Sequence, residues 1–304
     1  MSMNQVTLRQ LKTFVTVCKQ LSFIGAAQEL FLTPPAVSMQ IKQIEEEIGL
    51  TLFERSSKSV QLTQAGEVLL THAQAVFQQL RDAEVALDAI KGVEGGRLVI
   101  GMVTTAKYFL PSILAAFKEQ YHAVDIVFYE GNRDQLLEKL SAGELDLAVM
   151  GRPPAESEMM SQSFAPNPHG IIASMQHPLA HKKNIPVAFF NQLPFLVREQ
   201  GSGTRAAMES FFKAHEIEPA NAMVMNSNET IKQAVMVNLG LSFVSLDTVR
   251  MEVSLGRLAI LDVVGLPVVK HWHLVQMRKV QPPAAEAFSR FMLTNRHKPT
   301  CFEH

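Results

Sequence analysis

Hydroxyl and guanidinium side chains recur where the second half of the sequence changes from strand-like to helix-like patterns. Thr104 and Thr105 follow an apolar run and precede a helical pattern, and Ser202, Thr204 and Arg205 precede another. Hydroxyls and the unbonded N–H groups at the start of a helix suit a carboxylate or a phosphate. The pattern therefore predicts a binding site for a small anion.

Further polar residues follow other predicted strands. Arg152 comes just after the apolar run 145–150, and Asn228 is placed at the start of a helix after the run 222–225. Ligands of open α/β sheets bind beyond the carboxyl ends of the strands. The residues expected to contact the anion are Thr104, Thr105, Lys107, Arg152, Arg198, Ser202, Thr204, Arg205 and Asn228. Taken singly, the threonines and Asn228 could only cap helices, and Gly201 and Gly203 could only make a turn.

Chemistry of other kinds lacks a supporting pattern. Five histidines could suggest a metal site: His169, His177, His181, His271 and His273. They form no HExxH pair, so a structural role is favoured for them. Segment 271–273 is strand-like, which would place its two histidines on one face. Segment 201–204 lacks the lysine and spacing of a phosphate-binding P-loop. No serine elbow, paired carboxylates or redox cysteines are found. We therefore expect no enzyme activity, no metal and no cofactor.

Composition indicates a folded chain of more than one domain. The 304 residues are 47% hydrophobic and 19% charged, with a net charge of −1, so large cores are expected and a basic coat is not. Two cysteines, Cys18 and Cys301, argue against a disulfide framework and fit a reducing compartment. The polar segment 1–9 is unlike a secretory signal, and no apolar run approaches the ~20 residues of a membrane span. A cytoplasmic location is therefore expected.

The first 62 residues predict a winged helix-turn-helix. Apolar residues at helical spacing cover 8–21, Ser22 is placed to cap a short second helix, and Thr33 with Pro34 is placed to start a third helix that stops at Gly49. Apolar segments 52–55 and 60–62 flank a polar turn at 56–59 and indicate a small hairpin, the wing. Two short helices and such a hairpin form a known DNA-binding motif.

A long helix and a hinge follow. Segment 63–91 contains no proline, and apolar residues recur in two rows seven residues apart: Leu69, Val76, Ala83 and Ile90, then Ala73, Leu80 and Leu87. A seam of about three heptads favours a dimerising linker helix, although an amphipathic helix packed on its own domain would show the same pattern. The glycine-rich segment 92–96 predicts a hinge.

Beyond the hinge, short apolar strands alternate with helices in two similar series. This pattern predicts an α/β fold with a largely parallel sheet in two lobes, the first at about 97–165 and 268–293, the second at about 166–267. The expected domains are therefore a DNA-binding domain at 1–62, a linker helix at 63–91 and a ligand-binding domain at 92–304.

The N-terminal segment resembles the helix-turn-helix of LysR-type transcriptional regulators. The matching positions keep one register over Ala26, Ala27, Leu30, Thr33, Ala36, Val37, Ser38, Ile41, Ile44, Glu45, Ile48, Gly49, Leu52, Phe53 and Arg55. The small Ala26 and Ala36 let two helices cross closely, while Val37, Ile41 and Ile44 form a buried stripe. The resemblance covers essentially the whole chain and implies a type 2 periplasmic-binding-protein-like effector domain, a homotetramer and regulation by a ligand.

Contacts to DNA are expected from the third helix and the wing, at Thr33, Pro34, Ser38, Met39, Gln40, Lys42, Arg55 and Lys58. The family commonly has glutamine where this chain has Pro34, and arginine where it has Met39. Both departures remove polar groups that would reach bases, so DNA shape would carry more of the specificity. Residues 1–62 have a net charge of only +1, and tethered copies would bind DNA better than one.

Several C-terminal segments resemble one subgroup, the RuBisCO-operon or Calvin-cycle regulators (CbbR): 103–111, 150–154, 166–169 and 198–205. That resemblance implies phosphorylated metabolites, among them ribulose bisphosphate, or NADPH as effectors. The expected partners are promoter DNA, a small anionic metabolite, further copies of the chain and RNA polymerase, without a membrane. The alternative that stays open is a two-lobed solute-binding or ligand-sequestering protein that does not regulate genes.

Overall fold

The computed structural model describes residues 5–55, 60–91, 95–155, 158–191, 193–219 and 221–294. The chain forms two compact units, Met1–Glu84 and Val85–His304, each with its own hydrophobic core. The predicted wing turn at 56–59, part of the predicted hinge (92–94) and the tail 295–304 with Cys301 lie outside the described residues.

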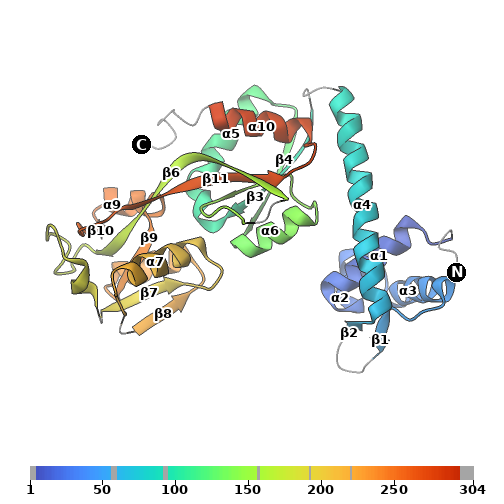
Figure 1. Ribbon diagram of the computed structural model, residues 1–304, viewed down its shortest axis with the longest axis horizontal. Helices are drawn as coiled ribbons and strands as arrows, with labels where there is room; N and C mark the ends of the chain where they lie inside the picture. Colours follow the sequence, from blue (N-terminus) through green and yellow to red (C-terminus); the bar gives the residue numbers. More distant parts are fainter. Residues whose placement is uncertain are drawn as a thin grey trace. The chain divides into compact units, whose positions relative to one another are not determined.

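The first unit has the predicted order of helices and hairpin (Figure 1). Helices α1 (Leu8–Gln20), α2 (Phe23–Glu29) and α3 (Pro34–Ile48) precede strands β1 (Phe53–Arg55) and β2 (Val60–Leu62), and α4 (Gln64–Lys91) follows. The Ser22 hydroxyl accepts the N–H of Gly25 as the N-cap of α2, and Gly49 ends α3 at φ 71°. The expected helix-turn-helix and hairpin are confirmed.

Small and branched side chains pack the three helices together. Val37, Ile41 and Ile44 of α3 are buried as predicted, against Phe14 of α1 and Ala26 of α2. Ala36 is half-buried. The Cys18 thiol lies in this core, and burial raises its pKa to about 12, so it stays protonated and suits neither redox chemistry nor a metal.

The N-terminal half of helix α4 packs on the core of the first unit. The Thr63 hydroxyl accepts the N–H of Gly66, and Leu69 and Ala73 are buried in the core of the first unit. Further along, Val76 is 39% exposed, Leu80 42% and Leu87 59%. The later part of the heptad seam is therefore uncovered in a single chain, as far as its side chains are described.

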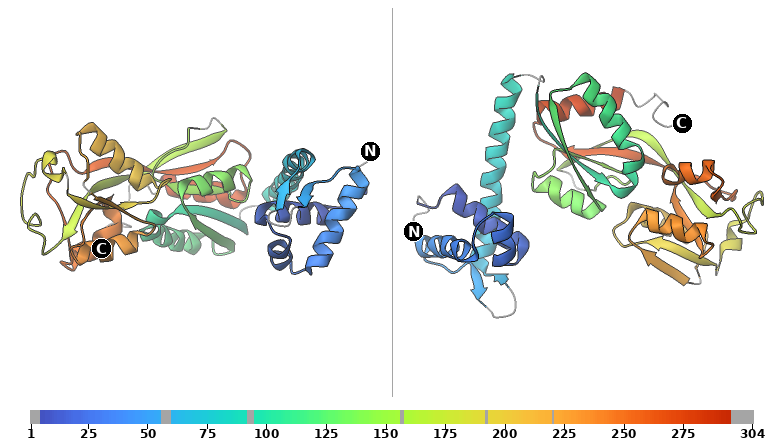
Figure 2. Two further views of the ribbon diagram at one scale, coloured as in Figure 1. Left: turned by 90° about the horizontal axis from the view of Figure 1, so that it is seen from below. Right: turned by 180° about the vertical axis from the view of Figure 1, so that it is seen from behind.

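The second unit contains a mixed sheet with helices on both faces (Figure 2). Its strands run in the order β4-β3-β5-β11-β6-β9-β7-β8, with β10 paired to β6. Strand β3 is parallel to β4 and β5, and β7 is parallel to β8 and β9, whereas β6 and β11 pair antiparallel with their neighbours. The expected largely parallel sheet is thus divided by two antiparallel strands.

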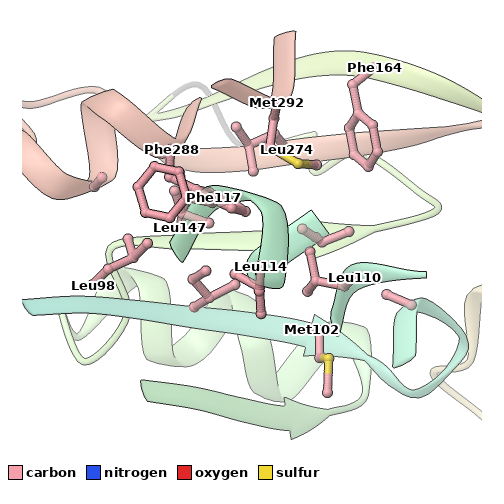
Figure 3. Close-up of a cluster of buried hydrophobic side chains, with 14 of the residues drawn as sticks. Leu98, Met102, Leu110, Leu114, Phe117, Leu147, Phe164, Leu274, Phe288 and Met292 are labelled. Atoms are coloured by element: carbon pink, nitrogen blue, oxygen red, sulfur yellow. The ribbon is translucent and has the colours of Figure 1, made fainter. Parts of the chain in front are cut away.

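The first lobe is built on β3 (Gly96–Val103), β4 (Val124–Gly131) and β5 (Leu147–Met150). Helices α5 (Leu110–Gln120) and α10 (Pro283–Thr294) cover one face, and α6 (Arg133–Ser141) covers the other. Figure 3 shows Leu110, Leu114 and Phe117 of α5 between the strands and Phe288 and Met292 of α10. The alternation of β3 side chains between the two faces explains why both faces are apolar.

The second lobe repeats this plan with β7 (Pro194–Arg198), β8 (Asn221–Met225), β9 (Leu241–Ser245) and β10 (Leu258–Ile260). Helix α7 (Gly203–Ala214) covers one face, and α8 (Asn228–Met236) with the short α9 (Arg250–Ser254) covers the other. Phe195 and Val197 face α7, whereas Leu196 faces α8.

Two long strands join the lobes. Strand β6 (Met159–Ser174) continues from the first lobe into the second, and β11 (Val268–Met277) returns beside it, paired from Val268↔His169 to Met277↔Met159. The sequence patterns indicated only parts of these strands and did not indicate α10. Their residues therefore belong to both lobes, and the loops after β3, β4, β5 and β7 lie next to them.

Candidate nucleic-acid interface and ligand pocket

The outer face of α3 is exposed, as a helix that reads DNA requires. Ser38, Met39 and Lys42 are exposed, with Met39 57% accessible. Lys42 forms an i,i+4 ion pair with Glu46 at 3.3 Å. An exposed pair of this kind contributes little stability and can exchange its partner for a phosphate.

The start of α3 offers fewer donors than a usual helix N-terminus. Thr33 occupies the N-cap position, but its exposed hydroxyl makes no capping bond. Thr33 therefore stands at the predicted N-cap position, but its side chain does not cap the helix. Pro34 and Pro35 fill the first two helical positions and have no N–H to offer a phosphate. The Thr33 hydroxyl remains available for that contact.

Gln40 lies differently from its neighbours in the predicted set. It is half-buried, and its Oε1 accepts a hydrogen bond from the Thr13 hydroxyl of α1 at 2.7 Å. This bond uses the amide oxygen to hold α1 against α3 and leaves the amide N–H groups for other partners. In the wing, the Arg55 side chain and Lys58 lie outside the described residues.

A cavity of about 510 Å³ lies between the two lobes of the second unit. Residues after β3, β4, β5 and β7 line it together with residues of β6 and β11. Six of the nine predicted ligand residues are among them: Thr104, Thr105, Arg152, Arg198, Ser202 and Thr204. The topology brings them together because the carboxyl ends of parallel strands meet at one edge in each lobe.

Three hydroxyls of the wall are unused by the protein. Thr105, Ser202 and Thr204 are 6–8% exposed, and their hydroxyls make no hydrogen bond within the part of the chain that the structure describes. Ser202 precedes α7 as its N-cap without a side-chain capping bond. The Ser202 hydroxyl therefore remains available to a ligand.

Arg198 is buried and already paired. Its guanidinium donates from Nε and Nη2 to the Glu199 carboxylate at 2.7 and 2.8 Å, and from Nη1 to Asn228 Oδ1 at 2.6 Å. Nη2 also donates to the Thr104 hydroxyl of the first lobe at 3.2 Å. The guanidinium thus makes four hydrogen bonds. The Glu199 carboxylate balances its charge, and the bond to Thr104 connects the two lobes.

Three predicted residues lie away from the cavity. Asn228 is the second-lobe partner of Arg198, and Ser227, not Asn228, is the N-cap of α8. Arg205 donates to Glu209 and to the carbonyl of Arg198, and lines a smaller hollow of about 160 Å³. The Lys107 ammonium lies 5.7 Å from the centroid of the Tyr108 ring.

The sequence patterns missed several residues of the wall. Asn132 and Arg133 start α6, Asn167 and His169 come from β6, and Lys270, His271 and His273 come from β11. The change from a strand pattern to a helix pattern after β4 could have indicated Asn132 and Arg133. Those of β6 and β11 gave no such signal, because they lie within the strands that cross between the lobes.

The wall carries an excess of positive charge. Among the described lining residues, Arg133, Arg152, Arg198 and Lys270 are cationic, and Glu199 is the acid that opposes them. Arg152 and Lys270 form no ion pair with any described residue. Arg133 pairs with Asp134 through Nη1 at 3.2 Å, but its buried Nε has no hydrogen-bond acceptor among the described residues. Such a wall favours an anion.

Burial disfavours the charged form of two histidines of the wall, His169 and His273. Burial lowers the pKa of His169 to about 4, while its Nδ1 contacts the Asn167 carbonyl at 2.9 Å and its ring stacks on Phe243. Burial also lowers the pKa of His273. Among the described residues no group of three histidine, cysteine or carboxylate side chains is arranged to hold a metal ion.

Comparisons with known proteins agree with these observations. The family model of the LysR substrate binding domain matches residues 91–296, and that of the bacterial regulatory helix-turn-helix protein, lysR family, matches residues 8–67. No helix within the described ranges has the length and apolar character to cross a membrane.

Curated relatives match over nearly their whole length. The transcriptional regulator CfxR of Cupriavidus necator is 45% identical over 95% of this chain and 91% of its own length. CbbR of Rhodospirillum rubrum is 45% identical over 94% of this chain and 95% of its own length. The CcmR regulatory domain of Synechocystis in complex with 2-PG covers 67% of this chain and 98% of its own, with 33% identity and a TM-score of 0.62.

Proposed function

Because the chain belongs to the LysR family of bacterial transcriptional regulators, we propose that it controls carbon-fixation genes in response to a phosphorylated metabolite. The observation that carries the ligand part is the cavity wall, with an excess of cations and three unused hydroxyls. The relatives named as CfxR and CbbR support the choice of genes, and the CcmR complex with 2-PG supports the size and charge of the ligand.

In this proposal the exposed face of α3 reads promoter DNA. Thr33, Ser38, Met39 and Lys42 face solvent together, and Gln40 contributes only the donors left by its bond to Thr13. Met39 and Pro34 offer apolar contacts, so base discrimination there depends on thymine methyl groups and DNA shape. The helix-turn-helix family match disfavours the alternative of a solute-binding protein without gene regulation.

Assembly is part of the same proposal. The uncovered seam of α4 pairs two chains, and two such pairs form the expected tetramer that spans successive grooves. Action on chromosomal DNA places the protein in the cytoplasm. Contact with RNA polymerase stays a prediction.

In the cavity, Arg152, Lys270 and Arg133 would bind the phosphate, and Thr105, Ser202 and Thr204 would donate hydroxyl hydrogens to it. Arg198 would shape the wall without binding the anion, because its donors serve Glu199, Asn228 and Thr104, and Asn228 would hold Arg198 through its Oδ1 from outside the cavity. Lys107 and Arg205 would stay outside the contact.

A footprint on the promoter of a RuBisCO operon and on the promoter upstream of its own gene tests the proposal. We expect specific protection that changes in extent or position with 2-PG, ribulose bisphosphate or NADPH. If neither promoter shows specific protection, the regulation of these genes is rejected. Protection unaffected by any of the three compounds would reject the phosphorylated ligand alone.

An arginine pair separates the ligand from general charge effects. Arg152→Ala should weaken the binding of the active compound about tenfold or more, because a charge-assisted hydrogen bond is lost. Arg205→Ala, which removes the same charge outside the cavity, should change the affinity less than threefold in isothermal titration. Equal effects of both variants would contradict the assignment of Arg152.

A further inference from the structure

A cluster of ionisable side chains lies beside the cavity but lines no part of it. Tyr108 comes from the 3₁₀ helix Thr104–Tyr108 of the first lobe, Glu229 and Lys232 from α8, and Glu252 from α9 of the second lobe. The mechanism of ligand binding proposed above uses none of the four. Lys232 is the buried member, whereas the Glu252 side chain is 15% exposed and the Glu229 side chain 47%. A buried charge is costly unless it has partners, so the surroundings of Lys232 call for an explanation.

Lys232 is the centre of the cluster. Its side chain is 4% exposed, and its ammonium lies 3.0 Å from Glu229 and 2.7 Å from Glu252. The same ammonium lies 4.8 Å from the centroid of the Tyr108 ring, within the range of a cation–π interaction. The Tyr108 hydroxyl donates a hydrogen bond to the Glu229 carboxylate. One buried cation thus holds groups from both lobes.

The cluster is connected to the cavity wall through chain neighbours. Thr104, at the other end of the same 3₁₀ helix as Tyr108, accepts a hydrogen bond from Arg198. Asn228, the residue before Glu229, accepts another. Among the described residues, side chains therefore bridge the lobes in the wall, through Arg198 and Thr104, and also outside it, through Tyr108 and Glu229.

We infer that Tyr108, Glu229, Lys232 and Glu252 form an interlobe clasp that positions Thr104 and Arg198 and thereby sets the affinity of the cavity for its ligand. This inference rests on the proposed function, since it concerns the binding of the same ligand. A ligand that contacts both lobes binds the fraction of molecules whose lobes are already correctly placed, and its apparent affinity falls with that fraction. The clasp keeps that fraction high.

The main test is Tyr108→Phe in the full-length protein. The variant retains the aromatic ring over Lys232 and loses only the hydroxyl bond between the lobes. A hydrogen bond to a charged group has a net effect that corresponds to about a tenfold change in an equilibrium constant. We expect the dissociation constants of 2-PG and ribulose bisphosphate, measured by isothermal titration, to rise by up to about tenfold, because the change in affinity cannot exceed the change in the equilibrium between the lobe placements.

A second measurement needs no ligand. Spin labels on Glu119→Cys of α5 and Lys213→Cys of α7, both exposed positions, report the distance between lobes in a Cys301→Ser background. Labelled chains are diluted with unlabelled chains, so that the distance measured lies within one chain. Tyr108→Phe should broaden the distance distribution or shift it to longer distances in the ligand-free protein.

Tyr121→Phe is the matched control. Tyr121 also lies in the first lobe, its ring stacks on Phe117 at 4.6 Å, and its hydroxyl forms no hydrogen bond with any described residue. This variant should leave both readouts unchanged. In a second pair, Lys232→Arg should retain most of the affinity that Lys232→Met loses, which a simple packing role would not produce.

The outcomes separate the two proposals. If Tyr108→Phe matches the wild type in both ligand affinity and label distance, the clasp is rejected. If neither compound binds the wild type, the proposed ligand class fails, and the label distances alone decide on the clasp. An altered distance together with an unchanged affinity for a ligand that binds the wild type would also reject it, because the clasp would then not act on the cavity.

Discussion

An arginine in a cavity wall can bind an incoming anion only with donors that the protein has left unused. By that measure Arg198 and Arg152 differ, although both follow a strand and both were expected to bind the ligand. Arg198 is turned toward Glu199, Asn228 and Thr104, whereas Arg152 has no ion-pair partner among the described residues. Sequence patterns place a side chain at the end of a strand but do not indicate which partner takes its charge.

At the same scale, His169 makes stability depend on pH. Its buried ring is held neutral with a pKa of about 4, against 6.5 in the unfolded chain. The unfolded state therefore binds the proton first, and stability is full above about pH 6.5 and falls as the pH drops toward 4, by about 3 kcal/mol in total. Urea unfolding at pH 7 and pH 4.5 should show this loss in the wild type.

The comparison that isolates His169 uses two glutamine variants. In His169→Gln the stability difference from the wild type should shrink as the pH falls, since only the wild type loses the contribution of a neutral ring. His181→Gln, in which an exposed ring is replaced, should follow the wild type. If His169→Gln instead parallels the wild type between pH 7 and pH 4.5, other groups cause the loss.

At the scale of elements, local patterns predicted most helices and strands and the places where they start and stop. Ser22 caps α2 and Gly49 ends α3 in the left-handed conformation, because these functions depend on the residue itself. The long strands β6 and β11 were predicted only in part. Their pairing joins residues about a hundred positions apart, and polar residues such as Asn167 and Lys270 interrupt the apolar pattern because they face the cavity.

Helix α4 gives a prediction of this scale. Leu80 is 42% exposed in one chain, and if the seam pairs two chains, Leu80→Lys places a charge in the paired face. Losing one buried leucine costs about 2 kcal/mol per chain, so the dimer dissociation constant should rise more than a hundredfold. Light scattering measures the change in mass, and Gln79→Lys adds the same charge at the neighbouring exposed position without loss of assembly.

The expected result requires that both variants keep their helix content by circular dichroism. If Leu80→Lys and the wild type have the same mass at micromolar concentration, the seam does not assemble the protein. The simpler interpretation of the heptad pattern, packing within one domain, would then apply to all of α4, as it already does to Leu69 and Ala73.

At the scale of the whole molecule, the first lobe is completed by the end of the chain. Trp272 and Leu274 of β11 and Phe288 and Met292 of α10 share one core with Leu98 of β3. A chain that ends at residue 282 loses α10 and should leave this core open to water, because several fully buried side chains lose their cover. The first unit has a separate core and should stay folded.

Limited proteolysis compares that chain with one that ends at residue 295, which removes only the tail. The shorter chain should be cleaved rapidly within 95–282 and yield a resistant fragment of the first unit, while the longer one should resist as the wild type does. Equal resistance of the two chains would mean that α10 is dispensable for the first lobe.

The late arrival of α10 has a consequence during protein synthesis. About 200 residues separate the end of α4 from the end of α10, which a ribosome needs roughly 10–40 s to translate. During that interval the helix-turn-helix can fold while the sensing half is still incomplete. Premature stop codons late in the gene should therefore yield fragments that occupy operators yet ignore the metabolite, and that interfere with intact subunits.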